Sequence, residues 1–74
     1  MQVWVRYKEH EVQVRVERLD SVINVAQKAR GEKVPIPEEG WDAYHPRWIW
    51  AVDKYSSLDR LGVIEGDTIT FRSR

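Results

Sequence analysis

The chain has 74 residues, no cysteine, and twelve basic side chains balanced by twelve acidic ones. This length predicts a single domain over residues 1–74, and the lack of cysteine excludes disulfides and a catalytic thiol within it. Zero net charge argues against a non-specific nucleic-acid binder, which needs a basic surface to neutralise phosphates. No apolar stretch approaches the length of about 18 residues that a membrane span needs, and the first residues do not show the pattern of a signal peptide. We therefore expect a cytoplasmic protein without membrane insertion.

Alternation of apolar and polar residues predicts a β-hairpin at the start of the chain. In residues 1–7, two valines share a face with the methionine and the tyrosine, while Trp4 and Arg6 lie on the opposite face. In residues 12–16, three valines alternate with polar residues, among them Arg15. A period of two is typical of a half-buried strand, and β-branched side chains suit it. Trp4, Arg6 and Arg15 are therefore expected on the outward face.

The period then changes to that of a helix. Asp20 and Ser21 are N-cap residues by type, and small apolar residues follow Val22 at helical spacing. Gly31 fits the position just after a helix end, where a left-handed conformation is common. The sequence predicts a helix of about ten residues that packs on the hairpin.

Residues 32–46 contain all three prolines and an excess of acids, and we expect them to form a long loop. Its aromatic residues are Trp41, Tyr44 and His45. These side chains either close over the sheet as a small satellite core or present a binding surface. A structural use of His45 is favoured over a pH-sensing one.

A third strand is predicted over residues 47–52, where apolar and aromatic residues return. Trp48 and Trp50 share one face, which we expect to face the helix as part of the core. Ile49 then points outward as a single apolar side chain.

The rest of the chain predicts a short helical turn over residues 56–61, ended by Gly62, and a turn over residues 65–67. A last strand follows over residues 68–71, with residues 72–74 as a polar tail. The order is β-hairpin, helix, long loop, strand, short helical turn and strand. This order predicts an α+β two-layer sandwich.

The residues offer no catalytic, cofactor or metal site. His10 and His45 are far apart and lack the cysteines of a zinc site. Glu38, Glu39 and Asp42 lack the spacing of a calcium loop. No nucleophile triad or phosphate-binding loop occurs, and a small sandwich leaves little room for a pocket. We expect a protein that is not an enzyme and needs no cofactor.

The element order and several stretches resemble the ubiquitin-like β-grasp family. The opening residues 1–6 look like the opening of ubiquitin, and residues 47–51 look like its third strand. The most specific likeness is the closing run Leu58-x-x-Leu61-Gly62-Val63-x-x-Gly66-Asp67-x-Ile69-x-Phe71. The resemblance covers nearly the whole chain and implies the ubiquitin-like fold.

Within that family, the chain is most similar to the YukD- and EsaB-type bacterial ubiquitin-like proteins of type VII (WXG-type) secretion. The likeness lies in the helix run Val22-Ile23-x-x-Ala26, the Pro37-x-Glu39-Gly40 loop and the tryptophan-bearing strand. It implies an accessory protein that binds protein partners, secretion-system components among them, and is not conjugated.

The resemblance also bears on the binding surface. Ubiquitin's main partner-binding patch is apolar, and of the matching positions only Ile49 keeps that character. Lys8, Thr70 and Arg72 are polar there, so ubiquitin-receptor binding is not expected. A second ubiquitin surface, centred on an exposed aromatic of the first strand, matches Trp4. Exposed aromatic and arginine side chains are typical binding anchors. The predicted partner-binding residues are Trp4, Arg6, Arg15, Trp41, Tyr44, Arg47 and Ile49.

Other functions stay open. A covalent modifier or sulfur carrier needs a C-terminal Gly-Gly, and this sequence ends Arg72-Ser73-Arg74. A small scaffold or effector subunit of a larger enzyme assembly is a further alternative. A homodimer is also open, because edge strands and exposed tryptophans invite pairing.

Overall fold

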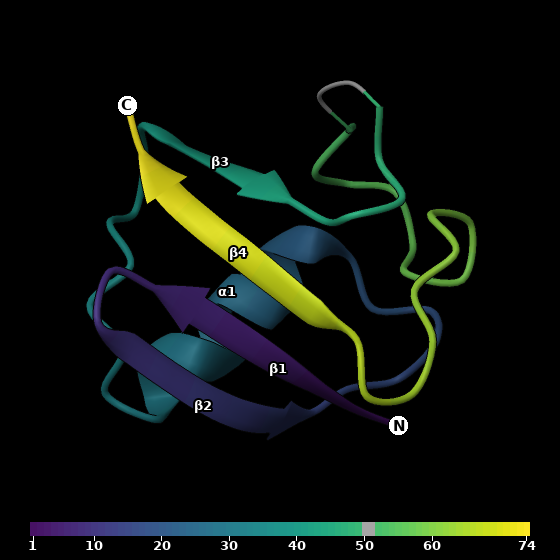
Figure 1. Cartoon of the computed structure of the whole chain (residues 1–74), viewed down its shortest axis with the longest axis horizontal. Helices are drawn as coiled ribbons and strands as arrows, with labels where there is room; N and C mark the ends of the chain where they lie inside the picture. The colour runs from purple at the N-terminus through teal and green to yellow at the C-terminus, as the bar shows by residue number, and fades with distance from the viewer. Residues whose placement is uncertain (50–51) are drawn as a thin grey trace.

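The computed structural model describes residues 1–49 and 52–74. It contains the strands β1 (Gln2–Tyr7), β2 (His10–Arg15), β3 (Trp41–Tyr44) and β4 (Thr68–Ser73), and the helix α1 (Val22–Gly31). The strands form one sheet in the order β2-β1-β4-β3, and α1 lies behind it in Figure 1. A helix packed on one face of a sheet is the predicted α+β arrangement, which is confirmed.

The N-terminal hairpin forms as its alternation predicts. β1 pairs antiparallel with β2, so that Val3 lies opposite Val14 and Val5 opposite Val12. Val3 and Val5 are fully buried and Val14 nearly so. β1 also pairs in parallel with β4, which makes the sheet mixed and places both chain ends in its two central strands. Four half-buried strands sharing one apolar face give the helix a surface to pack on.

Helix α1 begins at the predicted cap. The Ser21 hydroxyl accepts the Asn24 N–H at 3.2 Å, and the Ser21 N–H donates to the Asn24 side-chain oxygen at 2.9 Å. This reciprocal capping box satisfies donors that a helix start leaves unpaired. The buried helix face consists of Val22, Val25, Ala26 and Ala29.

The helix end differs from the prediction. Gly31 is the last helical residue, and Lys33, with φ +70°, takes the left-handed position beyond the end. The Lys33 N–H donates to Arg30 O at 2.9 Å and the Val34 N–H to Ala29 O at 3.1 Å. These two bonds are a Schellman motif. The reason lies in the core, since the turn at Lys33 is what carries Val34 to its buried position.

The predicted third strand is wrong. β3 is Trp41–Tyr44, within the segment expected to be a loop, and residues 47–49 are not strand. The His45 carbonyl accepts the Trp48 N–H at 2.9 Å, which closes a turn and takes the chain away from the sheet. Trp50 and Ala51, which belonged to the same prediction, lie outside the described residues.

The closing segment agrees with its pattern more closely. The Gly62 N–H donates to Asp59 O and the Val63 N–H to Leu58 O, so the predicted helical turn ends in a second Schellman motif with Gly62 at φ +76°. The last strand is longer than predicted. β4 runs to Ser73, so Arg72 and Ser73, which were expected to belong to a tail, are part of the sheet.

The core lies between α1 and the sheet. A half-buried shell that includes Trp48 packs against the buried residues. The largest fully buried side chains are Phe71, Leu58, Ile69, Val3, Val5, Val16, Val22, Val25 and Val34. No helix within residues 1–49 and 52–74 is long and apolar enough to cross a bilayer.

A Cβ added at either of two glycines would meet no neighbouring atom, so alanine substitutions there test backbone conformation without a change in packing. Gly31 is helical, whereas Gly62 has a positive φ. We expect Gly31→Ala to raise the free energy of unfolding by about 0.5–1 kcal/mol, because alanine favours the helix. The matched Gly62→Ala should lower it by about 1 kcal/mol or more, because only glycine adopts that φ without strain. Urea denaturation measures both, and equal effects of the two changes would contradict these backbone assignments.

Candidate interaction face

The outward side of the sheet, opposite α1, gathers most of the predicted partner-binding residues. We call this surface the outer face: the side chains of Trp4, Arg6, Glu11, Gln13, Arg15, Asp42, Tyr44, Thr68, Thr70 and Arg72. They occupy alternate strand positions, and most of the strand residues between them are buried or half-buried. Alternation makes this face polar except for two aromatic rings.

Trp4 lies near the middle of the outer face. It stands opposite Gln13 of β2 on one side and Thr68 of β4 on the other. Trp4 is 37% exposed, which confirms the prediction that its side chain points away from the core. A large aromatic between two polar neighbours gives the surface one apolar anchor.

Arg6 occupies the next row of the outer face. It lies opposite Glu11 and forms an ion pair with it at 2.6 Å, with both side chains well exposed. Such a solvated pair contributes little to stability. Across the sheet, Arg6 is opposite Thr70, which in turn is opposite Tyr44. Arg15 lies at the end of β2 and is exposed.

Tyr44 is the second aromatic of the outer face, and β3 brings it there. Its side chain is 46% exposed, and the guanidinium of Arg72 stands 5.0 Å from the ring centre. A cation over an aromatic face is attracted by the ring's negative charge density. Arg72 was not predicted as part of the surface. The alternation of β4, followed to its true end, would have identified it.

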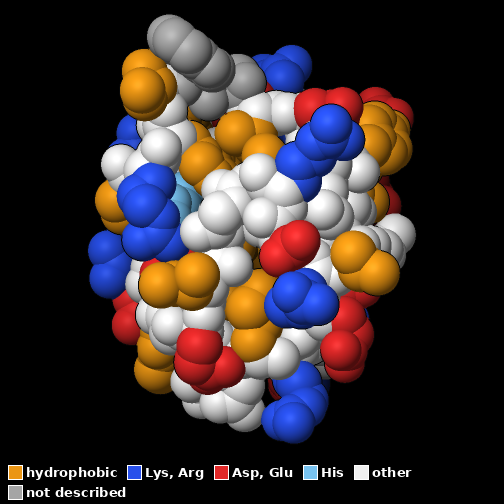
Figure 2. All heavy atoms as spheres, turned by 90° about the vertical axis from the view of Figure 1, so that its right-hand side faces the viewer, with side chains coloured by type: hydrophobic (Ala, Val, Ile, Leu, Met, Phe, Trp, Pro, Cys, Tyr) orange, Lys and Arg blue, Asp and Glu red, His pale blue; other side chains and the backbone are white. Residues whose placement is uncertain are grey.

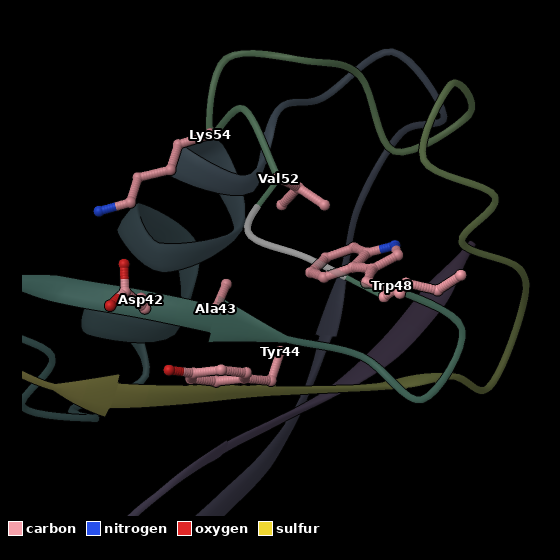
Figure 3. A pocket seen from close by; sticks show the side chains of 7 residues that line it. Asp42, Ala43, Tyr44, Trp48, Val52 and Lys54 are labelled. Atoms are coloured by element: carbon pink, nitrogen blue, oxygen red, sulfur yellow. The ribbon is translucent and has the colours of Figure 1, made fainter.

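A pocket of about 330 Å³ lies beside the outer edge of β3. Figure 3 shows Ala43 and Tyr44 on the strand side, with Trp48 and Val52 facing them from the following loop. Trp48 is held by a bond from its indole N–H to Leu61 O at 2.9 Å. Ile49, which also lines the pocket, is 82% exposed as predicted. The pocket thus joins Ile49 to the Tyr44 side of the outer face.

Trp41 does not belong to this surface. It is only 3% exposed and packs edge-on against Phe71, with ring centres 5.1 Å apart. The Lys54 ammonium stands 4.0 Å from the ring centre and also donates to the Trp41 carbonyl. The prediction that Trp41 binds a partner is therefore wrong. It is a core residue, because the β3 phase that turns Tyr44 outward turns Trp41 inward.

Asp67 forms a hub beneath one end of the outer face. One of its carboxylate oxygens accepts from the Ile64 N–H at 2.9 Å, from His45 Nε2 at 2.8 Å and from the Arg47 guanidinium. The side chain of His45 is 1% exposed. Its Nδ1 accepts the Arg47 N–H at 3.1 Å, so its proton lies on Nε2. The structural use of His45 thus fits its position.

Arg47 is engaged within the chain at this hub. Besides Asp67, its guanidinium donates to Gly62 O at 2.9 Å. Its charge is directed at Asp67 and away from the outer face. Arg47 therefore lies apart from Trp4, Arg6, Arg15 and Tyr44, which the sheet brings together.

Burial by itself would raise the pKa of Asp67. The hydrogen bonds from Ile64 and His45 and the charge of Arg47 outweigh burial, and hold the pKa below its ordinary value of 3.8. The carboxylate is therefore ionised at neutral pH and stabilises the fold in that form.

The part of the chain that the structure describes contains no group of three or more histidine, cysteine, aspartate or glutamate side chains able to hold a metal. Elsewhere, the exposed Leu19 and Ile64 line a hollow together with Met1 and Val63. On the side formed by the loops after β3, small apolar areas are separated by charged groups (Figure 2). No aromatic side chain of the described residues lines the hollow at Leu19, so the outer face remains the better candidate.

The structure is similar to solved ubiquitin-like structures. It matches ubiquitin from Caldiarchaeum subterraneum with a TM-score of 0.80 and 19% identity, over 100% of this chain and 92% of that one. It matches the ubiquitin-like domain of an Arabidopsis thaliana protein with a TM-score of 0.78 and 22% identity, over 96% and 73%. No protein-family model and no curated protein matches the sequence. The fold is thus the ubiquitin-like β-grasp, as the resemblance implied.

The two tryptophans of β1 and β3 should respond differently to truncation. Trp41→Ala removes a buried ring and should cost about 3–5 kcal/mol of unfolding free energy. Trp4→Ala removes a ring that is more than one third exposed, and should cost about 1 kcal/mol or less. Denaturant unfolding followed by circular dichroism measures both. A Trp4→Ala loss as large as that of Trp41→Ala would show that Trp4 is structural.

Acid should destabilise the fold partly through Asp67. Because its pKa is lower in the folded chain than in the unfolded one, its contribution is present above pH 3.8 and is lost as the pH falls below that value. Asp67→Asn should cost about 1–3 kcal/mol at pH 7. It should also make stability less dependent on pH between about 5 and 2. Urea midpoints across this range test the expectation, and parallel curves for the two proteins would contradict it.

Proposed function

We propose that this chain, whose fold is that of ubiquitin, is a non-catalytic module. It binds protein partners through its outer face and is not conjugated to them. We take the YukD- and EsaB-type accessory proteins of bacterial type VII secretion as its functional model, acting in the cytoplasm. The observation that carries the proposal is the pair of exposed rings, Trp4 and Tyr44, on one arginine-bearing sheet surface.

The composition of the outer face supports this proposal. Tryptophan, tyrosine and arginine are the side chains most enriched at binding hot spots. None of the three residues Trp4, Tyr44 and Arg72 is needed to fill the core, since all are exposed. Tyr44 is held by its contact with Arg72, so less conformational entropy is lost when a partner covers it.

Arg74 lies beside the outer face, where it contacts Asp42. The Arg74 N–H donates to Gly40 O at 2.7 Å, and its guanidinium donates to both carboxylate oxygens of Asp42. The bond from Arg74 lowers the pKa of Asp42, so the pair is charged at neutral pH. These contacts hold residue 74 against β3.

Photo-crosslinking in the native host tests the proposal. A photoreactive phenylalanine analogue replaces Tyr44, and in a control chain it replaces Gln27, which is exposed on the helix side. We expect a light-dependent product with a secretion-system component from position 44 only. Trp4→Ala in the same chain should reduce its yield about tenfold, because losing a hot-spot side chain costs about 1.4 kcal/mol or more.

Three outcomes would contradict the proposal. Equal products from positions 44 and 27 would remove the outer face as the binding surface. Adducts that form without light and survive denaturation would show a covalent modifier. A product with an enzyme subunit would replace the secretion role with that of a scaffold or effector subunit.

A further inference from the structure

β2 is an edge strand whose outer side is open (lower edge of the sheet in Figure 1). Val16 and Met1 exchange backbone hydrogen bonds, with the Val16 N–H donating at 2.8 Å. This hydrogen-bonded pair fixes which residues of β2 direct their peptide groups toward β1, because hydrogen-bonded and non-hydrogen-bonded pairs alternate along an antiparallel ladder. The peptide groups of Glu11, Gln13 and Arg15 therefore point away from β1.

Little within the chain covers these peptide groups. The Lys28 ammonium donates to Arg15 O at 3.2 Å. Among residues 1–49 and 52–74, no hydrogen bond reaches the backbone N–H or C=O of Glu11 or Gln13. An edge of this kind is a template for another strand.

The side chains on this edge form a symmetric charge pattern. Glu11, Gln13 and Arg15 all point to the outer face and are all exposed. Gln13 is the centre, with a negative residue two positions before it and a positive one two positions after it. When such a segment runs antiparallel to itself, each charge meets its opposite.

We propose that two copies of this chain pair through β2, antiparallel and centred on Gln13. The two Gln13 residues face each other, and Glu11 of each copy lies opposite Arg15 of the other. The outward peptide groups of the two edges then exchange backbone hydrogen bonds. Opposite charges directly across an antiparallel ladder stabilise it, so charge as well as hydrogen bonding selects this register.

The other antiparallel registers lack this complementarity. Centring the pair on Glu11 or on Arg15 sets like charges against each other. Centring it on Val12 places Glu11 opposite Gln13, and centring it on Val14 places Arg15 opposite Gln13. Neither register pairs opposite charges within the strand. Lys28 is compatible with the proposed register, because the Arg15 carbonyl has a second lone pair for the incoming N–H.

The pairing gives the molecule a doubled interaction surface. The two-fold axis passes between the two Gln13 residues, perpendicular to the sheet, so both outer faces lie on one side and both helices on the other. Trp4 is opposite Gln13 within each copy, so the two Trp4 rings flank the axis. This dimer does not depend on the proposed function. A partner that carries two binding sites would gain from the paired surface.

Sedimentation equilibrium at increasing protein concentration tests the pairing. We expect a concentration-dependent dimer that weakens with added salt, because the paired charges are exposed. Arg15→Glu and Glu11→Arg, each alone, should weaken the dimer about tenfold or more, since each replaces two attractive contacts with repulsive ones. An equimolar mixture of the two variants should restore it as a heterodimer, because every opposed pair again has opposite charges.

Two further variants serve as controls. Gln13→Pro should abolish the dimer and leave the fold intact, because proline is tolerated where the strand N–H points to solvent. Tyr44→Ala, on the opposite edge strand, should leave the dimer unchanged. Thermal melts confirm that each variant is folded. A wild type that stays monomeric up to about 1 mM would overturn the proposal. A dimer that survives Gln13→Pro but is lost with Tyr44→Ala would also overturn it.

Discussion

The hydrogen bonds around Asp67 are the interaction on which the arrangement of this chain most depends. The carboxylate collects the Ile64 N–H, the His45 ring and the Arg47 guanidinium, while the Asp67 carbonyl accepts the Trp4 N–H at 2.7 Å. These contacts join the start of β4, the start of β1 and the chain just after β3. A 74-residue protein without disulfides has few long-range constraints beyond its core, and this one is polar, with the His45 ring buried and the Asp67 carboxylate mostly so.

The hub also explains where the outer face acquires its second aromatic ring. Because His45 is held at Asp67, the residue before it is the last of β3 and lies opposite Thr70. The strand phase then turns Tyr44 outward beside Arg72 and turns Trp41 into the core against Phe71. The same anchor fixes the turn that carries Trp48 to the pocket beside β3. A structural contact therefore positions the residues to which we assign binding.

Periodicity predicted the hairpin, the helix and the last strand, because in each the core face repeats over several residues. It failed for β3, where only Trp41 and Ala43 face the core and the neighbouring prolines favour a loop. The longer aromatic run after Pro46 matched a strand better, but a turn closed by the His45 carbonyl diverts it. Trp4, Arg6 and Arg15 were placed correctly on the surface by alternation. Arg72 was missed and Trp41 misassigned because both depend on where β3 and β4 lie. The hub itself could not be predicted, since its four residues meet only in the folded chain.

The tautomer of the His45 ring tests the hub most directly. A long-range ¹⁵N–¹H correlation spectrum at neutral pH separates the two imidazole nitrogens, and His10, in the hairpin, serves as the internal reference. The account predicts that His45 is fixed as the Nε2–H tautomer, with Nδ1 unprotonated and accepting the Arg47 N–H. A His45 spectrum that averages the two tautomers, or one with the proton on Nδ1, would contradict the account.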